Sequence, residues 1–297
     1  MTQRRAQLQP RFLPYVLLVP AFFIAGLVLI YPLVNGMVLS ATSYSLIDPG
    51  YRWVGLANFR SILSDPVYWE VFLNSIVIIG SAVVIQLAVG MAVALLLNTR
   101  VPLRGAFRSS VFIIWIIPQI VISLLWLIMY NSEYGILNYV LKGIGVIDEY
   151  VVWLGRPWPA RIAHIITHGW RGVPFFMVMI LAALQTIPTD IVDAARIDGA
   201  GSFQRFRVIT VPFIRHIVGL SVLLSVVRLF QDITLTTILT QGGPVYATTT
   251  LGIYVYKEAF IGFQMGRASA IGVTWLVFLI LLAAVYVRMV TTTEFRK

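Results

Sequence analysis

Three charged residues lie inside stretches of this sequence that are otherwise strongly apolar. Arg171 belongs to the stretch 161–184, and Arg228 and Asp232 belong to the stretch 217–239. A charge at the centre of a bilayer costs at least about 2.5–3.5 kcal/mol on insertion scales, so such residues are normally functional or mutually paired. Arg228 and Asp232 are four residues apart, which favours one helix face and allows either a structural ion pair or a polar path for a ligand. Two arginines facing one cavity suit an anionic ligand, whereas neutralisation of Arg228 by Asp232 suits a neutral one equally well.

Other kinds of site chemistry have little support in the sequence. His164 and His168 have the i, i+4 spacing that can hold zinc, but no third ligand lies near them and the glutamate of a metalloprotease motif is absent. The chain has no cysteine, which excludes disulfides, thiolate metal sites and cysteine nucleophiles. It has no Gly-x4-Gly-Lys-Ser/Thr loop, so we expect no ATP hydrolysis by the chain itself. A membrane enzyme is disfavoured because no nucleophile and base stand together.

The elements that position these residues are predicted to be transmembrane helices of one domain, 1–297. Hydrophobic residues make up 59% of the chain and charged residues only 11%, against about a quarter charged in soluble domains. A helix needs about 20 apolar residues to cross a bilayer. Six stretches qualify, and they predict an all-α integral membrane protein with spans at roughly 12–39, 71–97, 109–130, 161–184, 217–239 and 266–290. The first is too long for a removed signal peptide, and we expect a kink near Pro32.

The basic residues predict how the chain is oriented in the membrane. Thirteen Lys and Arg residues fall in the termini and loops on one side, and five fall on the other. The positive-inside rule therefore places both termini and the loop 186–215 in the cytoplasm. The net charge of +10 is a topology signal rather than a nucleic-acid surface, because the arginines share no basic face with interleaved aromatics.

The cytoplasmic loop 186–215 is unusually polar for this chain and is predicted to form two short helices with a break between them. Its expected features are caps at Asp190 and Ser202, with Asp193 as the distal member of an acidic capping box, a break at Gly199 and Gly201, and an end at Pro212. An ordinary amphipathic surface helix is the plain alternative. Phe203 and Phe206 argue against that alternative, because a cytoplasmic loop gains nothing by exposing two phenylalanines without a partner to cover them.

The same loop resembles the EAA motif of ABC importer permeases. That motif reads E-A-A, three residues, G, nine residues and I-x-L-P, and the matching residues are Asp193-Ala194-Ala195, Gly199 and Ile209-Thr210-Val211-Pro212. The spacing matches throughout, with Asp for Glu at 193 and Val for Leu at 211. The resemblance implies the type I importer fold and a coupling helix that docks in a groove on an ATPase subunit. The residues it assigns to this coupling are Asp193, Ala194, Ala195, Gly199, Phe203, Phe206 and Pro212.

The resemblance extends to carbohydrate-uptake permeases, the group of the maltose and glycerol-3-phosphate permeases, through Trp170–Pro188 and Leu239–Gly272. It implies a solute of the sugar, oligosaccharide or glycerol-phosphate type. The implied solute-contacting residues are Arg171, Gly172, Phe175, Ser225, Arg228, Leu229 and Asp232. Phe175 would stack on a sugar face, while Ser225 and Asp232 would hydrogen-bond hydroxyl groups.

The implied assembly places the chain in a bacterial inner membrane among several partners. These are a second homologous permease, two ABC ATPase subunits that bind ATP and magnesium, and an extracytoplasmic solute-binding protein, with no cofactor in this chain and no nucleic acid. The alternative is an ion-gradient-driven secondary transporter or channel, in which Arg228 and Asp232 form part of a proton relay. No likeness between the two halves of the chain is visible, which weakens an inverted-repeat transporter.

Overall fold

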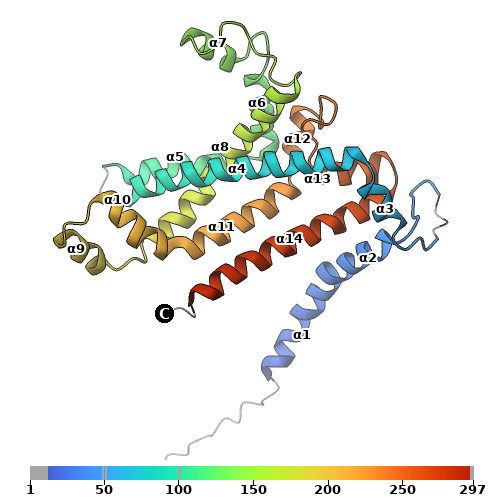
Figure 1. The fold of residues 1–297 in the computed structure, drawn as a ribbon, viewed down its shortest axis with the longest axis horizontal. Helices are drawn as coiled ribbons and strands as arrows, with labels where there is room; N and C mark the ends of the chain where they lie inside the picture. Colours follow the sequence, from blue (N-terminus) through green and yellow to red (C-terminus); the bar gives the residue numbers. More distant parts are fainter. Residues whose placement is uncertain (1–12, 49, 51, 100–101, 295–297) are drawn as a thin grey trace, which may run out of the picture.

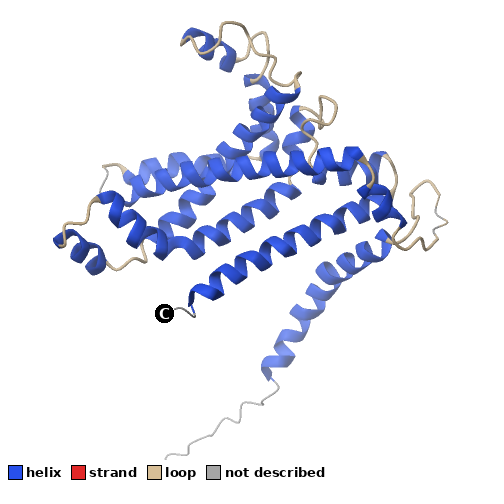
Figure 2. Cartoon of the chain, viewed as in Figure 1, coloured by secondary structure: helices blue, strands red, loops and turns tan. Residues whose placement is uncertain are grey.

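The computed structural model describes residues 13–48, 50, 52–99 and 102–294, and this part of the chain is helical with no strand (Figure 2). Five helices are long and apolar enough to cross a membrane, and a bent pair of helices gives a sixth span if the pair is counted as one. The predicted all-α membrane fold is therefore confirmed, and the count of six spans includes this bent pair. Phe12, where the first predicted span begins, and the two chain ends lie outside the described residues.

The first span consists of α1 (Leu13–Ala25), a π-helical turn (Gly26–Ile30) and α2 (Tyr31–Ser40). The π turn ends two residues before Pro32, the proline that was predicted to kink this span. The amide of Tyr31 donates to the carbonyl of Gly26, five residues back, and Pro32 follows with no amide proton to continue the regular pattern. Within the described chain the span packs mainly along α14, and most of its surface is exposed (Figure 1).

The second and fourth spans form the centre of the bundle. They are α4 (Pro66–Asn98) and α8 (Pro157–Leu184), which pack against each other along much of their length. Gly90 on α4 faces Phe176 on α8, and a Cβ at Gly90 would lie only 2.5 Å from the Cβ of Phe176 and 3.1 Å from the amide nitrogen of Met177. A small residue at this point lets the two backbones approach closely, as is common between membrane helices.

We expect Gly90→Ala to destabilise the protein by about 1–3 kcal/mol, because the added methyl group meets backbone and Cβ atoms that cannot rotate away. Gly80→Ala is the matched control, since it lies on the same helix and a Cβ there would meet nothing within 4 Å. Thermal unfolding of the two variants in detergent measures the difference. Equal melting temperatures would contradict a tight crossing at Gly90.

The third predicted span, 109–130, is wrong as a single straight helix. The chain forms α5 (Arg104–Ile116) and α6 (Gln119–Met129), which are bent by 95° at the break between them. The cause is Pro118, which directly precedes α6 and leaves Ile117 in an extended conformation. Beyond α6 the outer loop contains one short helix, α7 (Ile136–Gly143), which projects from the bundle (Figure 1).

The fifth span begins in the cytoplasmic loop and ends earlier than predicted. After α9 (Thr189–Ile197), the segments α10 (Ser202–Arg205), a π turn (Phe206–Thr210) and α11 (Val211–Gln231) form one helix of 30 residues. Pro212 therefore lies at the first turn of α11 and does not end the segment as predicted. A separate short helix, α12 (Thr234–Leu239), follows the break at residues 232–233.

The outer end of the bundle is closed by α3 (Ala57–Leu63), α13 (Leu251–Tyr256) with a π turn (Lys257–Ile261), and the start of α14 (Met265–Glu294). Trp275 of α14 is buried and stacks on Phe230 with ring centroids 4.4 Å apart. Arg267 pairs with Asp65 at 2.5 Å and with Glu258 at 3.2 Å. Figure 1 places α9 and α10 at the opposite end, the side to which the basic residues assign the cytoplasm.

Candidate functional site

A small cavity lies between α4, α8 and α11, the three helices of the main hydrophobic core. It is lined by all seven residues predicted to contact solute and by two others, namely Gln86, His168, Arg171, Gly172, Phe175, Ser225, Arg228, Leu229 and Asp232. The free volume is only about 20 Å³, which is room for about one water molecule. In this conformation the side chains of the chain fill the site and leave no space for a sugar ring.

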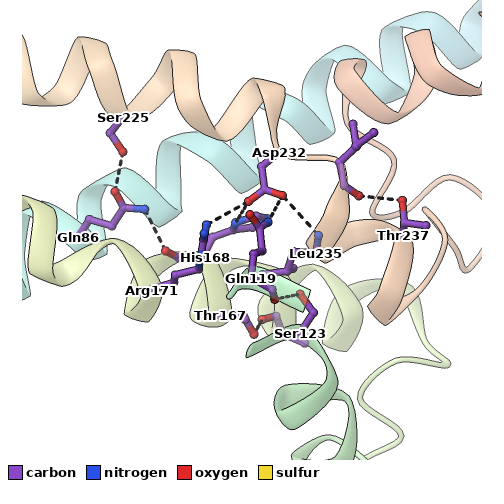
Figure 3. A network of polar contacts seen from close by, with 12 residues as sticks. Gln86, Gln119, Ser123, Thr167, His168, Arg171, Ser225, Asp232, Leu235 and Thr237 are labelled. Carbon is purple, nitrogen blue, oxygen red and sulfur yellow. Dashed lines mark hydrogen bonds and ion pairs between the residues drawn. The ribbon is translucent and has the colours of Figure 1, made fainter. Parts of the chain in front are cut away.

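Asp232 is the centre of the polar network in this cavity (Figure 3). Its carboxylate accepts hydrogen bonds from the amide of Gln119 on α6, from Arg171 on α8 at 3.4 Å, and from the backbone amide of Leu235 at 3.4 Å. The Nδ1 atom of His168 lies 3.9 Å from the same carboxylate. The side chain is only 6% exposed, so its charge depends on these partners rather than on water.

The predicted placement of Arg228 and Asp232 on one helix is wrong. Helix α11 ends at Gln231, and Asp232 follows in an extended conformation with φ −81° and ψ 94°. The carboxylate therefore points toward α6 and α8, and its ion pair is with Arg171 on α8.

The Arg228 guanidinium lies over two aromatic rings instead. Its carbon is 5.2 Å from the ring centroid of Phe175 and 5.9 Å from that of Trp115 on α5. Among the described residues, no carboxylate lies within 4.0 Å of this guanidinium. Phe175 was predicted to stack on a sugar ring, and in this structure its ring contacts the guanidinium of Arg228.

Gln86 joins the three core helices through hydrogen bonds. Its side-chain amide donates to the carbonyl oxygen of His168 on α8 at 2.9 Å and accepts from the Ser225 hydroxyl on α11 at 2.6 Å. The side-chain amide of Gln86 fits here because Gly172 has no side chain. A Cβ at Gly172 would lie 2.1 Å from the amide carbon of Gln86. Gly172 therefore lines the cavity and also makes room for this bridge.

Sequence reasoning missed Gln86 and His168 as cavity residues. Gln86 was not among the residues predicted to contact solute, and His168 was considered only as a possible zinc ligand. A usable signal existed for His168, because it lies three residues before Arg171 and so shares its helix face. In the part of the chain that the structure describes, no group of three or more possible metal ligands surrounds His164 and His168.

The coupling loop, 186–215, has the predicted break between two helical segments. Gly199 has a φ of +78°, which glycine adopts without the usual steric cost. The amide of Gly199 donates to the carbonyl of Arg196, and the amide of Ala200 donates to the carbonyl of Ala195. This pair of bonds is a Schellman cap that ends α9.

The predicted N-terminal caps of this loop are wrong. Pro188 and Gly201 hold the capping positions of α9 and α10, and neither helix has a side-chain cap. Asp193 instead pairs with Arg196 at 2.8 Å on the same exposed helix. Asp190 lies in the first turn of α9, where its charge still favours the positive helix end.

The tip of the coupling loop exposes apolar side chains at the cytoplasmic end. Ile197 is 87% exposed and Phe203 is 77% exposed, whereas Phe206 is partly buried. The other predicted coupling residues, Ala194 and Ala195, lie on α9 close to this tip. Apolar side chains that gather at an exposed tip form a surface suited to contact with another protein.

Comparison with known proteins gives the family. Residues 86–294 match the family described as "Binding-protein-dependent transport system inner membrane component". The chain is 31% identical to the sulfoquinovosyl glycerol transport system permease protein SmoG of Agrobacterium fabrum, over 98% of this chain and 94% of that protein. It is also 31% identical to the trehalose/maltose transport system permease protein MalF of Thermococcus litoralis, over 93% of this chain and 92% of that protein.

Solved structures share the fold. A chain of the bacterial ABC transporter involved in the import of the acidic polysaccharide alginate aligns with a TM-score of 0.76 and 21% identity, covering 94% of each chain. A chain of the MetNI methionine ABC transporter in an inward-facing conformation aligns with a TM-score of 0.55 over 77% of this chain. Together with the spans, the cavity and the family match, this likeness places the chain among the multi-pass permease components of the inner membrane: it belongs to the binding-protein-dependent transport system permease family of ABC importers.

Proposed function

We propose that this chain is one of two homologous membrane subunits of a bacterial importer for a sugar, oligosaccharide or glycerol-phosphate-type solute. Two ABC ATPase subunits would bind ATP and magnesium and dock on the coupling loop, and a solute-binding protein would deliver the solute to the outer side. The chain itself would hydrolyse nothing and hold no cofactor. The names of its relatives, one for sulfoquinovosyl glycerol and one for trehalose and maltose, support a carbohydrate-type solute.

The observation that carries this proposal is the position of two surfaces at opposite ends of one helix. The helix Ser202–Gln231 begins at the exposed Phe203 and ends beside the cavity, where it contributes Ser225, Arg228 and Leu229. A partner that moves the cytoplasmic end of this helix therefore also moves the cavity wall. This arrangement suits a transporter whose energy comes from a separate subunit.

The cavity has the composition expected of part of a carbohydrate path. Hydroxyl, amide, guanidinium and carboxylate groups line it together with the ring of Phe175. Because it has room for about one water molecule in this chain alone, the full path would form against the second permease subunit and open during the transport cycle.

The rival is an ion-gradient-driven carrier, in which Arg228 and Asp232 would form part of a proton relay. Asp232 is tied to Gln119, Arg171 and a backbone amide, which favours a fixed structural carboxylate over one that exchanges protons during a cycle. The exposed apolar tip also has no role in a self-sufficient carrier.

Transport in vesicles tests the proposal. We expect the chain, copurified with its partner permease and ATPases, to import labelled disaccharides only when ATP and the binding protein are both present. The same complex with ADP is the control. Steady uptake by the isolated chain, driven by a proton gradient, would contradict the proposal.

A further inference from the structure

We infer that the solute carries a negatively charged oxygen group and that Arg228 receives this group in the translocation path. This inference rests on the proposed function and narrows it from carbohydrate-type solutes in general to acidic ones. Its basis is the assignment of charges within the cavity, which only the three-dimensional structure reveals.

The charges that line the cavity do not balance. Two arginines, Arg171 and Arg228, and one carboxylate, Asp232, line it. The carboxylate is already committed to Arg171 at 3.4 Å, to Gln119 and to the amide of Leu235. The lining therefore has one more positive than negative charge, and the guanidinium of Arg228 has no carboxylate within 4.0 Å among the described residues.

The structure holds Arg228 facing the cavity rather than leaving it free to reach the membrane surface. The two flanking rings, Phe175 and Trp115, lie 5.2 and 5.9 Å from its guanidinium carbon. Aromatic faces attract a cation but cannot neutralise it. They also fix the planar group, so that its N–H groups remain available to a planar or tetrahedral anion.

The neighbouring groups match the rest of an acidic sugar. Ser225, three residues before Arg228 on α11, and Gln86 on α4 line the same cavity and carry hydroxyl and amide groups suited to sugar hydroxyls. The rings beside Arg228 are surfaces of the kind that pack against a sugar ring. The competing explanation is that a carboxylate of the second permease subunit pairs with Arg228. That explanation predicts a different result, because Arg228→Gln would then break a structural ion pair and reduce the uptake of acidic and neutral solutes alike.

The test measures uptake of three labelled probes by the complete importer in vesicles with its binding protein and ATP. The probes are a hexuronate disaccharide, a sulfonated hexosyl glycerol and neutral trehalose. The variants are Arg228→Gln, which removes the charge, and Arg228→Lys, which keeps it as a point charge. Arg108→Gln is the matched control, an exposed arginine on α5, the helix that also carries Trp115.

We expect the wild type to import at least one acidic probe in preference to trehalose. Arg228→Gln should reduce uptake of that probe at least about ten-fold, because a hydrogen bond to a charged group is lost. Arg228→Lys should retain part of the uptake, and Arg108→Gln should match the wild type.

Three results would overturn the inference. They are preferred import of trehalose by the wild type, equal uptake of the acidic probe by Arg228→Gln and wild type, and an equal loss of acidic and neutral uptake in Arg228→Gln. Each of these leaves the proposed function standing. Import of no probe at all by an assembled, ATP-hydrolysing complex would count against both the inference and the proposed function.

Discussion

Phe203→Ala is expected to abolish ATP-driven uptake while leaving the fold of this chain intact. Phe203 is 77% exposed, so its ring contributes little to the stability of the chain alone. In a docked complex the same ring would be a buried aromatic anchor, and truncation of such an anchor costs about 2 kcal/mol or more of binding energy. Uptake into vesicles and affinity for the ATPase subunits measure the effect.

The control for this prediction is Leu73→Ala. Leu73 is 60% exposed on α4, far from the coupling loop, and its truncation should leave both ATPase affinity and uptake unchanged. If Phe203→Ala loses uptake but keeps full affinity for the ATPase subunits, the ring is needed for a step after docking rather than for docking itself. Unchanged uptake would remove Phe203 from the coupling surface.

Asp232→Asn should give the largest loss of stability among single changes in the cavity. The carboxylate is 6% exposed and neutralises Arg171, whose side chain is 21% exposed. Removing one member of a buried ion pair leaves the other charge uncompensated, at a cost of about 3 kcal/mol. Thermal unfolding in detergent measures it, with the exposed Asp148→Asn in the outer loop as the control.

A double variant shows whether the loss of stability comes from the broken ion pair between Arg171 and Asp232 or from a general loss of packing. Arg171→Met combined with Asp232→Leu removes both charges and should be less damaging than the sum of the single changes, by about 1–3 kcal/mol. Additive effects would mean that Arg171 and Asp232 are not coupled. If Gln119→Leu also reduces the loss of stability caused by Asp232→Leu, then Asp232 is coupled to Gln119 on α6 as well as to Arg171 on α8.

The spans could be predicted from sequence because each is an apolar stretch of about 20 residues or more, and this signal is local. The bend at Pro118 could not, since residues 109–130 read as continuously apolar across it. A proline inside an apolar stretch has two outcomes in this chain. Pro174 stays inside α8, whereas Pro118 separates two helices at 95°.

The seven residues predicted to contact solute lie together in the structure, but the pairing of their charges was not predicted. All seven residues implied by the family resemblance line one cavity, because spacing along α8 and α11 is preserved locally. The partner of Asp232 was missed because the i, i+4 argument assumed that the helix continues to residue 239. Nothing local signals that α11 ends at Gln231, and the true partners come from α6 and α8, more than 60 residues away along the chain.

The unbroken helix from Ser202 to Gln231 has a mechanical consequence. Its 30 residues span about 45 Å at 1.5 Å per residue, so a tilt of about 5° at one end displaces the other by about 4 Å, roughly the width of a methyl group. The rod ends where the backbone becomes extended at Asp232, which is tied to α6 and α8. If that tie acts as the pivot, a push at the cytoplasmic end moves that end most and the cavity wall beside Asp232 least, so the passage would widen from the cytoplasm inward.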